Sequence, residues 1–62
     1  MRNDKRKLQQ HLAEKYARAA LADGLKYGDP EAIRQVKRFS QLSDQDCRKV
    51  LRDVADAMRR GE

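Results

Sequence analysis

Side chains that could perform catalysis are few in this chain and stand apart from one another. It contains one histidine, His11, and one cysteine, Cys47. A general base needs a nucleophile within hydrogen-bond reach and a pocket that excludes water, and a structural zinc site needs four ligands. The sequence has no Gly-rich phosphate loop, no CxxC pair and no two carboxylates at catalytic spacing. It therefore predicts a protein that is not an enzyme and uses no metal or cofactor.

Cys47 and the two tyrosines each have a structural interpretation that competes with a functional one. Cys47 falls in the first turn of a predicted helix, where the helix dipole can make a thiol reactive. It also lies at the spacing of that helix's apolar residues, and we expect a small buried side chain. Tyr16 and Tyr27 carry rings that can stack on bases. Tyr16 stands at core spacing and Tyr27 at a helix end, so we expect both to pack, Tyr27 over the end of the core.

The charge of the chain favours an acidic partner. Its 62 residues include 15 Lys and Arg against 10 Asp and Glu, which gives a formal net charge of +5. Proteins with such a balance bind nucleic acids, anionic membrane surfaces or acidic protein patches. Since acidic residues are also numerous, the position of the basic residues matters more than their number.

The most regular pattern in the chain is an amphipathic helix over residues 43–60. Its apolar residues recur at the three- and four-residue spacing of one helical face. A projection at about 100° per residue places Arg48, Arg52 and Arg59 on one flank of that face, and Asp46 and Asp53 on the other. The residues of the face are Cys47, Val50, Leu51, Val54, Ala55 and Met58.

Capping residues divide the chain into three helices. Gly24 is typical of a left-handed C-cap. Asp29 and Pro30 supply an N-cap and a first helical residue, and Ser43 can cap the helix that follows it. The predicted helices cover residues 4–23, 30–40 and 43–60.

A chain of this length forms one domain at most. No apolar stretch approaches the roughly 20 residues that a membrane-spanning helix needs, and no hydrophobic segment follows the basic N-terminus. We therefore expect a single all-α domain over residues 1–62, with a basic arm over residues 1–6, in the cytoplasm.

The helix expected over residues 4–23 carries more apolar surface than two short neighbours can cover. Its predicted inner face consists of Leu8, Leu12, Tyr16, Ala19 and Ala20. Beside that face, a second group widens the apolar arc to about 200°. This group consists of Ala13, Ala17 and Leu21. Either the helix lies between the other two, or the second group contacts another copy. Because so small a core is marginal alone, we favour a homodimer.

The other two predicted helices match the outline of a helix-turn-helix unit. The helix over residues 30–40 has a buried face of Ala32, Ile33, Val36 and Phe39, with basic residues opposite. A short turn leads to a helix with polar and basic residues in its early turns, where such units contact phosphates and base edges. The residues predicted to bind nucleic acid are Arg34, Lys37, Arg38, Gln45, Arg48, Lys49 and Arg52.

Two positions depart from that outline. Lys37 stands where a small residue is usual in the first helix, and Gln41 stands where the turn usually contains glycine. The alternative is a solvated surface on which arginines pair with acidic residues four positions away. Those pairs are Asp44–Arg48, Arg52–Asp56 and Asp56–Arg60.

These observations favour a small regulator that binds nucleic acid, DNA or RNA, as in transcription regulation. The alternative is an inhibitor or adaptor of phage or plasmid type that docks on a larger protein, because helix-in-groove recognition needs only apolar anchors at helical spacing. A peptide lying on a membrane surface is disfavoured, since the chain has no Trp and its apolar faces are rich in Ala and Val.

Overall fold

Three helices make up the fold, as the sequence predicts. The structure is a computed structural model that describes residues 2–61, with side chains from residue 5 onward. α1 spans Arg2–Ala22, α2 spans Pro30–Ser40 and α3 spans Asp44–Arg59. These bounds lie within two residues of the predicted ones. None of the described helices has both the length and the apolar character that crossing a membrane would require.

From Arg2 onward, the predicted basic arm over residues 1–6 is part of α1 and not a separate segment. The helix begins at Arg2 and continues without interruption into the bundle. Met1 and the side chains of residues 2–4 lie outside the described part of the chain. The cations of the arm that can be placed, Lys5 and Arg6, are therefore carried on a helix, and both are exposed.

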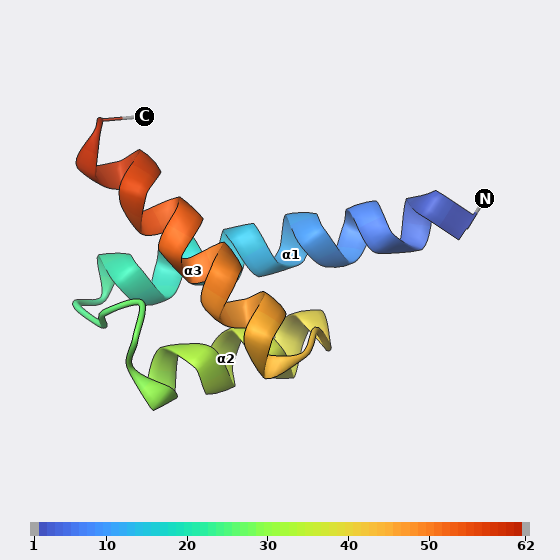
Figure 1. Cartoon of the computed structure of the whole chain (residues 1–62), viewed down its shortest axis with the longest axis horizontal. Helices are drawn as coiled ribbons and strands as arrows, with labels where there is room; N and C mark the ends of the chain where they lie inside the picture. Colours follow the sequence, from blue (N-terminus) through green and yellow to red (C-terminus); the bar gives the residue numbers. More distant parts are fainter. Residues whose placement is uncertain (1, 62) are drawn as a thin grey trace.

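α2 and α3 pack against the C-terminal half of α1, and the N-terminal half of α1 projects from the bundle (Figure 1). The molecule measures 35 × 24 × 16 Å along its principal axes. All three helices contribute to one core, which is built mainly from small and β-branched side chains. The buried residues of the core are Ala13, Ala17, Ala20, Ala32, Ile33, Val36, Cys47, Val50, Leu51 and Val54.

The buried face of α1 is rotated from the predicted one. Ala13 and Ala17 are fully buried within the single chain, whereas Leu8 is 58% exposed and Ala19 is also exposed. The alanine side faces α2 and α3 because small side chains allow helix axes to approach closely. Ala13 and Ala17 therefore cannot contact a second copy of this fold, which corrects the predicted interface. Leu21, its third member, is half-buried against the same core.

Phe39, which the sequence pattern assigns to the buried face of α2, lies at the edge of the bundle, and Ser40 is buried in its place. Phe39 is 48% exposed and stacks on Tyr16, with ring centroids 4.3 Å apart. Ser40 is buried instead. Its hydroxyl donates to the carbonyl of Val36 at 2.6 Å and accepts from the N–H of Leu42 at 3.3 Å. A buried hydroxyl with both partners satisfied is tolerated in a core, and the large ring is left at the edge of the bundle.

The predicted apolar face of α3 is confirmed in its first three turns, where Cys47, Val50, Leu51 and Val54 are buried. Further along the helix, Ala55 is half-buried and Met58 is 37% exposed. The apolar face of α3 is therefore more exposed towards the C-terminal end of the helix. α3 runs past the other two helices there (Figure 1).

All three predicted caps stand at the expected helix ends, and two of them have the expected capping geometry. The hydroxyl of Ser43 accepts from the N–H of Asp46 at 3.2 Å, and Gly24 adopts a left-handed φ of 100°. Asp29 precedes α2, but its side chain makes no capping bond. It accepts instead from the N–H of Lys26 at 2.9 Å, and so stabilises the turn before the helix.

Replacing Gln41 with glycine is expected to stabilise the fold by about 0.5–1 kcal/mol, because a side chain in the left-handed region is strained. Gln41 has φ 62° and ψ 21°, and its N–H closes α2 on the carbonyl of Lys37 at 2.8 Å. Thermal unfolding would measure the change as a rise in Tm of about 4 °C. Gln41→Ala is the control, since it keeps the strain. Equal melting of both variants would contradict the prediction.

Candidate nucleic-acid interface

A short turn fixes the relative position of α2 and α3. Residues 41–43 connect the two helices, and Leu42 packs against the core from within this turn. On the outer side, the ammonium of Lys37 lies 3.0 Å from the carboxylate of Asp44. Gln41 adopts the left-handed conformation that glycine usually supplies. The backbone therefore makes the tight turn even though the sequence lacks the glycine.

Two adjoining hollows bring basic residues of α2 and α3 together. One is lined by Arg34 and Lys37 of α2 and by Arg48 of α3. The other is lined by Arg48, Lys49 and Arg52 of α3. Because Gly28 and Arg48 belong to both hollows, the surface is continuous. We call this surface the basic face, and it consists of Arg34, Lys37, Arg48, Lys49 and Arg52.

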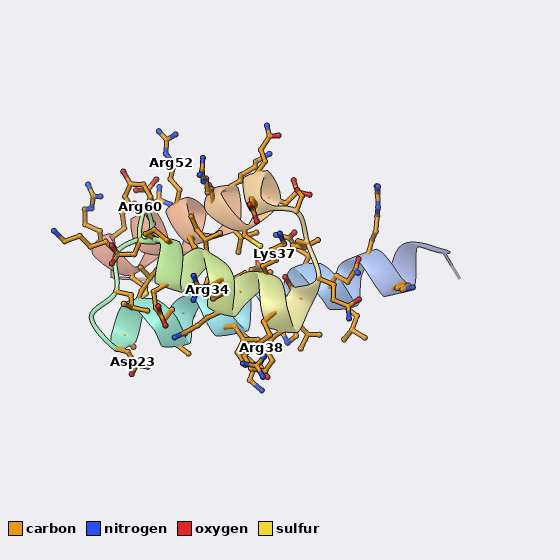
Figure 2. All side chains as sticks on the ribbon, turned by 90° about the horizontal axis from the view of Figure 1, so that it is seen from below. Asp23, Arg34, Lys37, Arg38, Arg52 and Arg60 are labelled. Atoms are coloured by element: carbon orange, nitrogen blue, oxygen red, sulfur yellow. The ribbon has the colours of Figure 1, made fainter. Side chains whose placement is uncertain are left out.

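Two of the seven predicted residues do not join the basic face. Arg38 points to the edge of the molecule opposite Arg52 (Figure 2). Its guanidinium carbon lies 5.9 Å from the centroid of the Phe39 ring. Gln45 is exposed but does not line either hollow of the basic face. Arg38 departs because each step along a helix turns the side chain by about 100°, which carries it away from the side where Lys37 reaches α3.

Tyr27 belongs to this surface, which the sequence pattern did not indicate. It is 47% exposed and lines the second hollow beside Arg48 and Arg52. The prediction that Tyr27 covers the end of the core is therefore wrong. Leu25, which the sequence also places over that end of the core, does pack half-buried against it.

The arginines of the basic face are not neutralised by the predicted pairs. Asp44 pairs with Lys37 instead of Arg48, and Asp56 lies 3.6 Å from Arg59 instead of pairing with Arg52. Within the described residues, neither Arg48 nor Arg52 takes part in an ion pair. Both guanidinium groups are exposed. They are thus available to an external anion without the loss of an internal contact.

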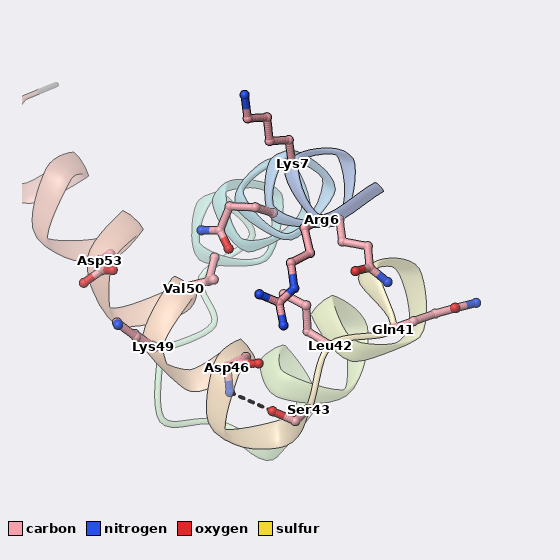
Figure 3. Close-up of a pocket in the computed structure, with 11 residues that line it drawn as sticks. Arg6, Lys7, Gln41, Leu42, Ser43, Asp46, Lys49, Val50 and Asp53 are labelled. Atoms are coloured by element: carbon pink, nitrogen blue, oxygen red, sulfur yellow. Dashed lines mark hydrogen bonds between the residues drawn. The ribbon is translucent and has the colours of Figure 1, made fainter. Parts of the chain in front are cut away.

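Two acidic residues of α3, Asp46 and Asp53, face a different hollow. Asp46 and Asp53 line a cavity of about 670 Å³ between the early turns of α1 and the start of α3. In Figure 3, Arg6 points into this cavity and Lys7 points away from it. Lys49 lies between the two surfaces and lines both. Arg48 and Arg52 are therefore separated from Asp46 and Asp53 across α3, as the helical projection predicts.

The residues that could carry other chemistry are placed as expected. Cys47 is buried, and burial raises the pKa of its thiol. Its sulfur lies 3.8 Å from the carbonyl oxygen of Leu42. A neutral, enclosed thiol is poorly reactive.

His11 is exposed on α1, in a shallow hollow with Glu14, Lys15 and Arg18. Over residues 5–61, no three His, Cys, Asp or Glu side chains are grouped so as to hold a metal ion.

The geometry is therefore that of a cationic surface with one aromatic ring, carried by two helices and the loop before them. Its chemistry suits the binding of a polyanion. Comparison with protein-family models, with curated proteins and with solved structures finds no match to this chain.

Proposed function

We propose that this protein is a small regulator that binds double-stranded nucleic acid through its basic face. The observation that carries the proposal is the continuity of that face: five cations from two helices line adjoining hollows. Clustered Lys and Arg on one side of a small domain form the electrostatic footprint of a phosphate-binding protein. The proposal includes no catalytic step.

The arrangement of α2 and α3 supports contact through α3. In helix-turn-helix proteins the second helix enters the major groove, and its early residues contact bases. Arg48 and Arg52 lie one turn apart on the exposed side of α3. An arginine at such a position can bind guanine or a phosphate with two parallel hydrogen bonds. Arg34, on α2, is placed to contact the adjacent backbone.

The charge distribution also favours one orientation of α3 on a duplex. A polyanion that approached from the side of α1 would meet Asp46 and Asp53 beside the cations Arg6, Lys7 and Lys49. On the basic face, Asp44 contributes the one carboxylate among the lining residues, and Lys37 lies 3.0 Å from it. The denser positive charge of the basic face thus favours the orientation in which that face meets the phosphates.

Binding is expected to fall steeply with salt. Each phosphate neutralised by a cation contributes about −0.9 to the slope of log affinity against log salt, so a face of this size predicts a slope of about −4. Fluorescence anisotropy of a labelled duplex of about 20 base pairs, titrated at several salt concentrations, measures it. Failure to bind at about 10 µM protein in low salt would refute the proposal.

A further inference from the structure

We propose that the protein forms an antiparallel homodimer through an exposed apolar stripe on α1 and the end of α2. The apolar stripe consists of Leu8, Leu12, Tyr16 and Phe39. Leu8 is 58% and Phe39 is 48% exposed, and the other two are partly exposed. This surface is distinct from the alanine side of α1, which the core of the single chain already covers.

The stripe is continuous along one side of the molecule. Leu8, Leu12 and Tyr16 follow one another at four-residue intervals, which places them on the same side of α1. Tyr16 extends the stripe to α2, because its ring stacks on Phe39 at 4.3 Å and an interplanar angle of 15°. Large apolar side chains that line up in this way mark a site of association.

The fold leaves this stripe uncovered because α1 is longer than the helices that pack on it. Its N-terminal half projects beyond α2 and α3 (Figure 1). Leu8 belongs to the projecting half, whereas the stack of Tyr16 and Phe39 lies beside the bundle. The two ends of the stripe therefore differ: one is a bare helix, and the other is a helix supported by its neighbour.

This difference makes the stripe complementary to a second copy of itself. Leu8 and Tyr16 lie at equal distances along α1 from Leu12. A two-fold axis beside Leu12 therefore brings Leu8 of each copy onto the Tyr16–Phe39 stack of the other, while the two Leu12 side chains meet at the centre. Such a self-matching patch is what a two-fold dimer requires. Each projecting half-helix then lies against the bundle of the other copy.

Charge selects the antiparallel arrangement over the parallel one. The early turns of α1 are cationic, with Lys5, Arg6 and Lys7 in succession, and its last turn has no basic residue. Asp23 follows directly, exposed. With the two-fold axis beside Leu12, Lys5 of one copy comes opposite Ala19 of the other, one turn before its exposed Asp23 and the negative end of its helix. A parallel pair would bring the cationic turns of the two copies together, and the chain already has a net charge of +5.

The dimer leaves the proposed nucleic-acid surface free. Arg38, which adjoins Phe39 in the stripe, and Arg52 of the basic face point to opposite edges of the molecule (Figure 2). Two copies would present two basic faces. The inference rests on the packing of α1 and α2 alone, so it stands or falls independently of nucleic-acid binding.

Sedimentation velocity of the full chain tests the dimer. Between about 10 µM and 1 mM, the sedimentation coefficient is expected to rise from that of a monomer to that of a dimer. Leu8→Glu is expected to hold the protein in the monomeric form over this range, with unchanged helical content, because Leu8 contributes nothing to the core of the single chain. Gln10→Glu makes the same change in charge at an exposed position away from the stripe and is expected to dimerise normally.

The orientation is tested by disulfide trapping, with the buried Cys47 replaced by alanine. A mixture of Leu8→Cys and Tyr16→Cys chains, tagged to differ in mass, is expected to give a mixed disulfide in high yield. Leu8→Cys alone is expected to give little. The reverse yields would overturn the antiparallel arrangement. The proposal would be overturned if the wild-type chain stayed monomeric over this whole range. It would also be overturned if Leu8→Glu left the dimer unaffected.

Discussion

Replacing Leu51 with aspartate is expected to unfold the domain completely. Leu51 is fully buried and has the largest side chain of the fully buried residues described. A carboxylate at that position would be surrounded by the apolar side chains of the core, and burying it without a partner costs several kcal/mol. A single core in a chain of this length supplies only about 3–5 kcal/mol. The cost therefore matches or exceeds the stability of the fold.

Circular dichroism would show the effect of Leu51→Asp as the loss of helical signal and of a cooperative melt. Met58→Asp is the matched control, because it introduces the same charge on the same helix at a residue that is 37% exposed. It is expected to cost less than about 1 kcal/mol, mainly by opposing the helix dipole. If Leu51→Asp melted cooperatively at the wild-type temperature, the assignment of the core would be wrong.

The double substitution Arg48→Ala with Arg52→Ala is expected to weaken duplex binding by about 30-fold, at a cost near 1 kcal/mol per lost contact. The slope of log affinity against log salt should become shallower by about 2, since two phosphates are no longer neutralised. The fold should remain intact because both side chains are exposed. Anisotropy titrations at several salt concentrations measure the affinity and the slope together.

A control of equal charge separates the basic face from net charge. Lys15→Ala with Arg18→Ala removes two cations from α1, where both line a different hollow together with His11. Only the weaker long-range attraction is lost, and at moderate salt this is largely screened. We expect an effect of less than about threefold. Equal losses in the two double variants would show that binding follows total charge, and would remove the basis for placing the contact on α3.

Local chemistry made the secondary structure predictable. Pro30 at the start of α2, the Ser43 cap of α3 and the left-handed Gly24 after α1 each act through a few neighbouring atoms. The buried face of α3 could also be predicted, because its four buried residues recur at the three- and four-residue spacing of one helical face. The separation of Arg48 and Arg52 from the acidic residues of α3 follows from the same period.

Which face of α1 is buried could not be predicted from such local signals. Apolar residues cover so much of its surface that periodicity allows several buried faces, and large side chains favoured the wrong one. The choice depends on how closely α2 and α3 can approach, and the alanines at positions 13 and 17 permit the closest contact. Leu8 and Phe39, which a hydrophobicity pattern assigns to the interior, are left outside.

The sequence by itself determined that this protein is a set of three helices with a basic side on α3, because helix caps and helical periodicity act over a few residues. Only the tertiary structure decided that Arg34 and Lys37 join that side while Arg38 does not, and that Tyr27 lies beside them. The physical reason is that these groups lie on different elements. Their proximity depends on the angle and distance at which the helices pack, which side-chain volumes in the core set collectively.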